Sequence, residues 1–471
     1  MTLLSRLCAG LALVMAFAGS ANAAVQGIFA HYMVAIKHQL LKTRQLAKPL
    51  KVGGMSSISQ ALADVSQAQA LGLDAFALNV QQPDADWSRA SLSLLFDAAS
   101  QIGFKLFFSM DMAIIASPSA CLPLLTQYVS HPAYYHYQSR PFLSTFRGGA
   151  SPSASNDWQT ALQTLNPAPF FVPNFEDHPS VTGGIFPASI FNTFPNLSGL
   201  MGWETAWPFQ GAPTPADSTS AASSDATNLA RVHAANKVYM MPLSSFQSKH
   251  HRYYGNWFRR GGLLLAQRMQ AVMDLQPDFV ELLTWNDAGE GHYFGNVWPE
   301  ALGGEEEITA EIDGFDHRGW QAVIRPWISA VKAGVRVGGG VVPVAGRAFA
   351  GTFWYRPLLK GADCSGDRFG LAKPSGWEDA EDTVSVVVML GRDSQGVRIR
   401  VWGGGNVLGE FDGKPGMNVY QVEARTGEQA VQVVASDGTF MGEGIGSGWI
   451  TNSIGDIGGI CNFNYQAVEI V

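Results

Sequence analysis

Eight short apolar runs, separated by segments with the pattern of helices, limit this chain to a small set of folds. Each run has the length and composition of a buried parallel strand. The runs cover residues 27–34, 74–80, 105–110, 142–146, 170–175, 199–203, 238–243 and 279–286. The clearest amphipathic stretches between them are residues 57–71, 90–102 and 263–275. Eight strands that alternate with helices over about 300 residues predict an α/β fold, the (β/α)8 TIM barrel.

Polar residues follow these runs. In a (β/α)8 barrel the carboxyl ends of the strands form the active site. At or just after the runs the sequence places Asn79, Asp111, Arg147, Glu176, Asp177, Glu204, Ser244 and Asp287, with His31 inside the first run. Residues that served only solubility would be scattered evenly along the chain. This gathering therefore predicts a catalytic face.

The last run continues into a pair of acids, Asp287 and Glu290, within the segment VELLTWNDAGEGHY. Two carboxyl groups among aromatic residues suit a polysaccharide hydrolase. One group acts as the general acid and the other as base or nucleophile, while flat aromatic faces stack on sugar rings. A capped strand end with a solvated acidic turn would give the same local pattern. The polar ends of the other runs favour the catalytic interpretation.

The composition changes after the eighth run. Residues 332–346 are rich in Gly and Val, which indicates a boundary. Beyond it, short β-type runs at residues 383–390, 397–402, 430–434 and 464–471 are separated by Gly, Asp and Asn turns. We therefore predict a catalytic barrel over residues 24–335 and a C-terminal all-β, sandwich-like domain over residues 345–471. The second domain could bind carbohydrate or simply pack against the barrel.

Residues 1–23 have the pattern of a secretory signal peptide. Arg6 supplies the positive charge, residues 7–17 the apolar core, and Ala21-Asn22-Ala23 the small residues of a cleavage site. The apolar core is shorter than the roughly 20 residues that span a membrane. We expect a secreted, extracellular monomer without a membrane segment. The net charge of −8 and the absence of a long basic block argue against a nucleic-acid partner.

Removal of the signal would take away Cys8 and leave three cysteines. In an oxidising compartment we expect Cys364 and Cys461 to form a disulfide and Cys121 to stay a buried free thiol. The chain has neither a His-Glu-x-x-His motif nor the Cys-pair spacing of a metal site. It also lacks the Gly-x-Ser-x-Gly pattern of an esterase. We expect no metal and no cofactor.

Six segments, taken in order, resemble one family. They cover residues 28–34, 73–79, 105–112, 131–146, 203–208 and 277–293. Together they resemble glycoside hydrolase family 71, the fungal endo-α-1,3-glucanases also called mutanases. The resemblance extends over roughly residues 27–330. It implies hydrolysis of α-1,3-glucan, with inversion, by a catalytic pair that matches Asp287 and Glu290.

Inversion implies carboxyl groups roughly 6.5–9.5 Å apart, against about 5–5.5 Å for retention. We assign Glu290 as the acid and Asp287 as the base. One departure from the family is Gly291, which is unusually small for the residue after the motif. Residues 210–228, rich in Ser, Thr, Ala and Pro, are expected to form a flexible loop on the catalytic face.

Further residues are expected to contact the glucan, namely His31, Asn79, Asp111, Trp203, Glu204, Trp207, Trp257, Trp285, Asn286, His292 and Tyr293. The aromatic members would stack on sugar rings, and Trp207 and Trp285 are favoured because they lie in or directly after strand ends. The histidines would keep one acid ionised. Each residue has a structural alternative: aromatic residues are mostly core, Asp111 could cap a turn, and Glu204 could pair with Arg147.

Two other functions are compatible with these patterns. One is a barrel glucanase for another linkage, such as β-1,3. The other is a secreted, catalytically inactive protein that binds glucan through the same aromatic cleft. The presence of both Asp287 and Glu290 argues against the inactive binder.

Overall fold

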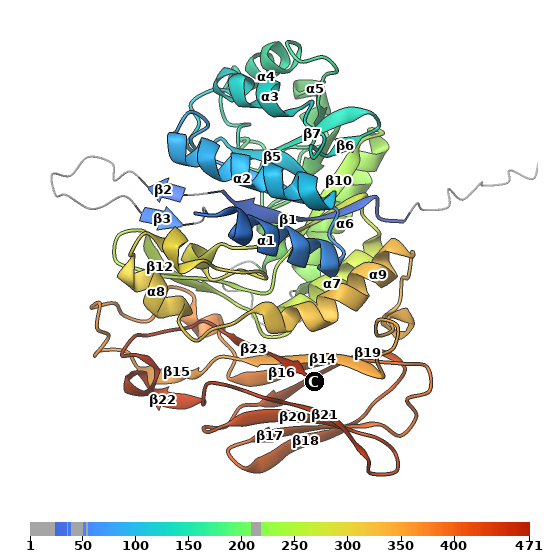
Figure 1. Cartoon of the computed structure of the whole chain (residues 1–471), viewed down its shortest axis with the longest axis vertical. Helices are drawn as coiled ribbons and strands as arrows, with labels where there is room; N and C mark the ends of the chain where they lie inside the picture. The colour runs from blue at the N-terminus through green and yellow to red at the C-terminus, as the bar shows by residue number, and fades with distance from the viewer. Residues whose placement is uncertain (1–23, 35, 39–49, 53–54, 209–217) are drawn as a thin grey trace, which may run out of the picture.

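The computed structural model of the chain describes residues 24–34, 36–38, 50–52, 55–208 and 218–471. The predicted signal peptide, residues 1–23, lies outside the described residues. Two regions follow one another along the chain and stack in Figure 1: an α/β region, in blue to yellow, and a region of β-strands, in orange to red. Among the described residues, no helix has both the length and the apolar character needed to cross a bilayer.

A parallel sheet forms the centre of the α/β region. Its strands follow the order β8-β7-β5-β4-β1-β13-β10-β9, and β6 pairs antiparallel with β7. Each of the eight predicted runs overlaps one of the parallel strands. The bounds are β1 Gly27–Met33, β4 Ala75–Val80, β5 Lys105–Asp111, β6 His136–Tyr137, β7 Arg140–Phe146, β8 Phe170–Phe171, β9 Gly199–Met201, β10 Val238–Leu243 and β13 Phe279–Leu282.

The sheet is curled, and its two end strands approach each other. The Ser198 amide donates to the Phe171 carbonyl over 2.8 Å, and the Met201 amide donates to the Pro173 carbonyl over 2.9 Å. Strand β8 is shorter than its apolar run because Pro173 has no N–H for a regular ladder. These backbone bonds link the segments that contain β8 and β9.

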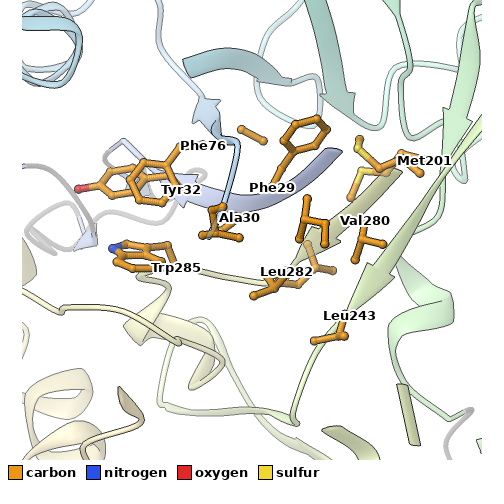
Figure 2. Close-up of a cluster of buried hydrophobic side chains, with 14 of the residues drawn as sticks. Phe29, Ala30, Tyr32, Phe76, Met201, Leu243, Val280, Leu282 and Trp285 are labelled. Atoms are coloured by element: carbon orange, nitrogen blue, oxygen red, sulfur yellow. The ribbon is translucent and has the colours of Figure 1, made fainter. Parts of the chain in front are cut away.

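Apolar side chains from neighbouring strands fill the space around the sheet. Figure 2 shows Ala30, Val280 and Leu282 on one side of β1 and β13, and Phe29 on the other side of β1. All four are fully buried. Burial of each large apolar side chain stabilises the fold by about 1.5–3 kcal/mol, so this packing accounts for much of the stability of the region.

Helices cover the sheet as the sequence predicts. The helix predicted over residues 57–71 is α1, with Ser57 as its N-cap: the Ser57 hydroxyl accepts from the Gln60 amide over 3.3 Å. It ends at Gly72, whose φ of 99° suits glycine. The bounds are α1 Ile58–Leu71, α2 Asp86–Ile102, α3 Leu122–Tyr128, α4 Ala154–Leu162, α5 Ile190–Thr193, α6 Ser218–Ala234, α7 Leu264–Leu275, α8 Glu306–Ile312 and α9 Gln321–Lys332.

The flexible loop predicted over residues 210–228 is wrong from Ser218 onward, where α6 begins. Residues 209–217 lie outside the described residues. Two buried contacts hold the helix: Asp225 pairs with Arg268 of α7 over 2.6 Å and accepts from the Tyr239 hydroxyl over 2.7 Å. Tertiary contacts thus outweigh the weak helix preference of the Ser- and Thr-rich sequence.

The C-terminal region is built from β-strands, as predicted. Two four-stranded antiparallel sheets, β19-β16-β14-β23 and β18-β17-β20-β21, share one apolar cluster, and β15 pairs with β22. Strand β16 has the sequence TVSVVVML, and every residue after its first is buried. The bounds are β14 Phe349–Tyr355, β15 Leu358–Asp363, β16 Thr383–Leu390, β17 Arg398–Gly403, β18 Asn406–Asp412, β19 Gly416–Glu423, β20 Gln429–Val434, β21 Phe440–Ile445, β22 Thr451–Ser453 and β23 Gln466–Ile470.

The cysteine predictions are confirmed. Cys364 and Cys461 form a disulfide with a Cα–Cα distance of 5.4 Å. Cys121 is free and buried, and burial raises the pKa of its thiol to about 12. A thiol that stays protonated at neutral pH is a poor nucleophile, so Cys121 has a packing role.

Candidate active site

A short turn after β13 carries Asp287 and Glu290. Asp287 caps a 3-10 turn, Ala288–Glu290, by accepting from the Glu290 amide over 3.1 Å, and its own amide donates to the Thr284 hydroxyl over 2.9 Å. Gly291 ends the turn with a φ of 67°, and a Cβ there would lie 2.7 Å from the Ser248 hydroxyl. Glycine is therefore required at this position, which explains the small residue noted in the sequence.

Strand β11 (Gln247–His251) brings two donors to Glu290. Lys249 Nζ lies 2.9 Å from Oε1 and Gln247 Nε2 lies 2.5 Å from Oε2. Burial opposes the charge on Glu290, but Lys249, His292 and Gln247 outweigh burial and lower the pKa of Glu290 to about 2. An ionised Glu290 does not fit the expected role of proton donor.

His292 lies between the two acids. Its Nε2 is 3.7 Å from Asp287 Oδ2 and 3.7 Å from Glu290 Oε2. One atom of each residue lies within 4.8 Å of the other two, a grouping compact enough for a cation. However, the Lys249 ammonium already supplies positive charge beside Glu290. We therefore assign no metal to this group.

A rim of aromatic and charged side chains extends from Lys249. Its ammonium lies 5.8 Å from the Trp257 ring centroid on β12 (Gly255–Arg259). Arg259 lies 5.0 Å from the Trp207 centroid and 2.9 Å from Glu204. Glu204 thus pairs with Arg259 and not with Arg147. The structure brings Trp207, Trp257, Glu204 and His292 together around the acids.

A second polar cluster lies at the ends of β1 and β5. His31 Nδ1 lies 2.7 Å from Glu281 Oε1, and its ring is 4.9 Å from that of Trp203. Asp111 accepts from Gln81 Nε2 over 3.0 Å and from the Ala113 amide over 3.1 Å. Burial raises the pKa of Asp111, opposed by these donors and by the charges of His31 and Arg147.

One predicted contact residue, Asn79, is buried with a side-chain oxygen that has no hydrogen-bond partner. The same is true of His31 Nε2 and of Glu281 Oε2. Buried polar atoms without partners are costly. These three atoms are also closed to solvent, so they lie beneath the site and not on an open surface.

Four predicted contact residues are corrected by the structure. Trp285 is 0% and Trp207 1% exposed, so neither offers an open face to a sugar ring. The Tyr293 hydroxyl donates to the Phe315 carbonyl over 2.6 Å, and its ring stacks on His317 at 3.9 Å. Asn286 is committed to the backbone of Met33, accepting from its amide over 2.8 Å and donating to its carbonyl over 3.1 Å.

The half-buried Trp203 and Trp257 remain as candidates for sugar stacking. Trp203 is held by Glu176, whose two carboxylate oxygens accept from the Trp203 and Glu204 amides, each over 2.9 Å. Burial raises the pKa of Glu176 to about 7. This carboxylate fixes the segment after β9 in place.

Sequence reasoning missed Gln247 and Lys249 as site residues. The stretch around them is rich in Lys, Arg and His, which is typical of exposed sequence, whereas His250 and His251 are buried in the structure. One sequence signal could have indicated them. Successive side chains of a β-strand point to opposite faces, so Gln247 and Lys249, two residues apart, lie on the same face of the strand.

The sequence matches the model of Glycosyl hydrolase family 71 over residues 25–471. The glucan endo-1,3-alpha-glucosidase agn1 of Schizosaccharomyces pombe is 31% identical over 416 residues, which cover 85% of this chain and 88% of the relative. A mutanase of Penicillium rubens is 30% identical over 415 residues, 87% of this chain and 82% of the relative. The ascus wall endo-1,3-alpha-glucanase of S. pombe is 27% identical over 369 residues, 74% of this chain and 77% of the relative. Because the match includes both regions and the Asp287–Glu290 turn, the chain belongs to glycosyl hydrolase family 71.

Proposed function

We propose that this protein hydrolyses α-1,3-glucan at the Asp287–Glu290 turn. The observation that carries the proposal is the ion pair of Lys249 with Glu290, which keeps one carboxylate charged beside a second acid. The relatives named for α-1,3-glucan or as a mutanase support the linkage. A pair of acids with different surroundings is what glycoside hydrolysis requires.

In the proposed reaction Glu290 is the base and Asp287 the acid, the reverse of the sequence-based assignment. Asp287 gives its proton to the glycosidic oxygen as the bond from that oxygen to the anomeric carbon breaks. Glu290 takes a proton from water while the water oxygen bonds to the same carbon. A carboxylate has about four acceptor sites, so Glu290 can accept from water and keep Lys249.

This single displacement inverts the anomeric carbon and releases a β-configured reducing end. The nearest oxygens of the two acids lie within 4.8 Å of each other, closer than the roughly 6.5–9.5 Å between the carboxyl groups of most inverting pairs. The configuration of the first product is therefore the sharpest test of the mechanism. NMR of fresh hydrolysate should show the β-anomer before mutarotation, and an α-anomer would overturn inversion.

The glucan is proposed to lie across the two polar clusters. Trp203 and Trp257 would stack on glucosyl rings, while His31, Asn79, Asp111 and Glu204 would bind hydroxyl groups. Support comes from the half-buried rings of Trp203 and Trp257 and from the exposed side chain of Glu204.

Four finer proposals complete this function. The curled sheet is a closed (β/α)8 barrel, supported by the two backbone bonds between its end strands. The catalytic domain spans residues 24–335 and the β-sandwich spans residues 345–471. Residues 1–23 are a signal for secretion, and the mature protein acts outside the cell as a monomer. N-terminal sequencing of secreted protein should begin at Ala24.

The test is reducing-sugar release from insoluble α-1,3-glucan, with β-1,3-glucan as the linkage control. Asp287→Asn and Glu290→Gln should each lose at least about 100-fold in rate. Glu300→Gln, an exposed acid, should keep wild-type activity. Release from β-1,3-glucan alone would support the other linkage. No release from either polymer, with retention of protein on the α-glucan, would support the inactive binder.

The roles of the two acids can be separated chemically. Azide should restore turnover to Glu290→Ala by replacing the activated water, with a β-glucosyl azide as product. A nigero-oligosyl fluoride, whose leaving group needs no proton, should restore turnover to Asp287→Ala. The opposite pattern of rescue would assign Asp287 as the base.

A further inference from the structure

The hairpin that carries Lys249 is attached to the C-terminal region. Its strands β11 and β12 pair so that Lys249 faces Trp257 and His250 faces Asn256. Along β11 the side chains alternate: Gln247 and Lys249 face Glu290, while Ser248 and His250 face away from it. The hairpin therefore has one face toward the acids and one toward the rest of the protein.

The second face meets the loop of residues 364–375. His250 Nε2 lies 3.0 Å from Asp367 Oδ2, and both side chains are buried. On the β12 side, the Phe258 amide donates to the Ser375 carbonyl over 2.8 Å, and Asn256 Nδ2 donates to the Ala372 carbonyl over 2.8 Å. The loop thus contacts both strands of the hairpin.

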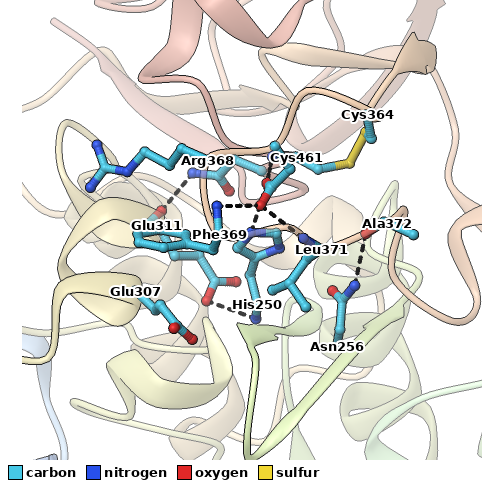
Figure 3. Close-up of polar contacts among 12 residues, drawn as sticks. His250, Asn256, Glu307, Glu311, Cys364, Arg368, Phe369, Leu371, Ala372 and Cys461 are labelled. Atoms are coloured by element: carbon cyan, nitrogen blue, oxygen red, sulfur yellow. Dashed lines mark hydrogen bonds and ion pairs between the residues drawn. A yellow bond between two sulfur atoms is a disulfide. The ribbon is translucent and has the colours of Figure 1, made fainter.

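Asp367 also organises the loop itself. Its Oδ1 accepts from the amides of Phe369 and Leu371 over 2.9 and 3.1 Å. Its Oδ2 accepts from the Cys461 amide over 2.6 Å. The Cys364–Cys461 disulfide ties the first residue of this loop to the segment whose amide Asp367 binds. Figure 3 shows His250 between the loop and Glu311.

We infer that Asp367 is a positioning residue: through His250 it holds the β11–β12 hairpin so that Lys249 stays beside Glu290. The C-terminal region thereby takes part in the reaction through the hairpin. The inference rests on the proposed function for its catalytic meaning. Its structural part stands on the contacts of His250, Asp367 and the disulfide alone.

The charges around each group define the expected pH effect. Glu290 faces Lys249, Asp287 and His292. The negative charge of Glu311 also raises the pKa of Lys249. His250 faces Asp367 and Glu307, and its amide donates to Glu311. If the hairpin moves away, Glu290 loses its closest cation and its pKa rises. The base then becomes protonated at a higher pH, so the acidic limb of the kcat/KM profile moves to higher pH.

The test compares Asp367→Asn with Asp363→Asn. Asp363 is the control because its carboxylate also accepts from the amide two residues on, that of Ser365, over 2.9 Å, while among the described residues it forms no hydrogen bond or ion pair with the hairpin. Two readouts are taken from each purified full-length variant: hydrogen exchange of residues 247–259, and the pH profile of kcat/KM on α-1,3-glucan.

Asp367→Asn should speed exchange in residues 247–259, lower kcat/KM by about 10- to 100-fold and raise the acidic limb, because small displacements of catalytic groups are costly. Asp363→Asn should change none of these. A Cys364→Ser/Cys461→Ser variant that stays folded should move in the same direction. Unchanged exchange and an unchanged acidic limb in Asp367→Asn would overturn the inference. Faster exchange with a wild-type protein inactive on every glucan would overturn the proposed function and leave the positioning intact.

Discussion

Two glutamates bind opposite faces of strand β11, and their pKa values shift in opposite directions. Glu290 accepts from the side chains of Gln247 and Lys249, and its pKa falls to about 2. Glu311 accepts from the Ser248 hydroxyl over 2.9 Å and the His250 amide over 3.1 Å, and burial raises its pKa to about 7. Burial opposes ionisation in both cases. Lys249 forms a direct ion pair with Glu290 but none with Glu311, so the nearness of the positive charge accounts for the opposite directions of the two pKa shifts.

Removal of the cation should have the largest effect. Lys249→Met leaves Glu290 with the neutral Gln247 donor and with His292 at 3.7 Å, so we expect kcat/KM to fall by about 100-fold and the acidic limb to move to higher pH. The control is Lys105→Met, whose ammonium donates to the Pro132 carbonyl over 2.7 Å at the amino end of β5, the end opposite Asp111. Steady-state rates across the pH range provide the measurement. A Lys249→Met enzyme with the wild-type acidic limb would show that Lys249 does not set the charge of Glu290.

The second effect concerns stability and depends on pH. Because the pKa of Glu311 is raised in the folded protein, its contribution is complete below the unfolded pKa of about 4.3 and is lost as pH rises through about 7. Glu311→Gln imitates the protonated acid. It should reduce the loss of unfolding free energy between pH 5 and pH 8 by about 2 kcal/mol. Urea unfolding at both pH values measures this, and an identical loss in both proteins would refute a protonated Glu311.

The smallest effect should come from one neutral donor. Ser248→Ala removes the hydroxyl that donates to Glu311, which should cost about 1 kcal/mol of unfolding free energy and change kcat/KM by less than about twofold. Ser394→Ala, which removes a buried hydroxyl bonded to the Gly391 carbonyl, is the matched control. A large loss of activity in Ser248→Ala alone would mean that the Ser248–Glu311 contact is also needed to hold Lys249 beside Glu290.

Periodicity allowed much of the fold to be predicted. The apolar runs at residues 27–34 and 238–243 coincide closely with β1 and β10, because strands buried on both faces need continuous apolar sequence. The amphipathic stretch predicted over residues 57–71 ends directly before Gly72, whose positive φ suits glycine and terminates α1. Local sequence chemistry controls each of these features.

The site was less predictable because tertiary contacts decide which way a side chain faces. Trp285 follows β13, which ends at Leu282, so strand alternation no longer specifies its direction, and it enters the core beside Phe76. Lys249 lies in a basic stretch that resembles exposed sequence. The ion pair with Glu290, an acid far away in the sequence, offsets the cost of burying the Lys249 ammonium.

The junction of the two regions limits how this protein can be engineered. Trp354 of β14 donates its indole N–H to the Gly262 carbonyl over 2.7 Å, and His317 lies 2.9 Å from the Asn464 side-chain oxygen. Trp354, Phe463 and Tyr465 belong to the same apolar core as the curled sheet. A truncation after residue 335 would leave that core open to water. Exchange of the C-terminal region for that of another hydrolase would therefore need a matching set of core residues, and a short linker would not be enough.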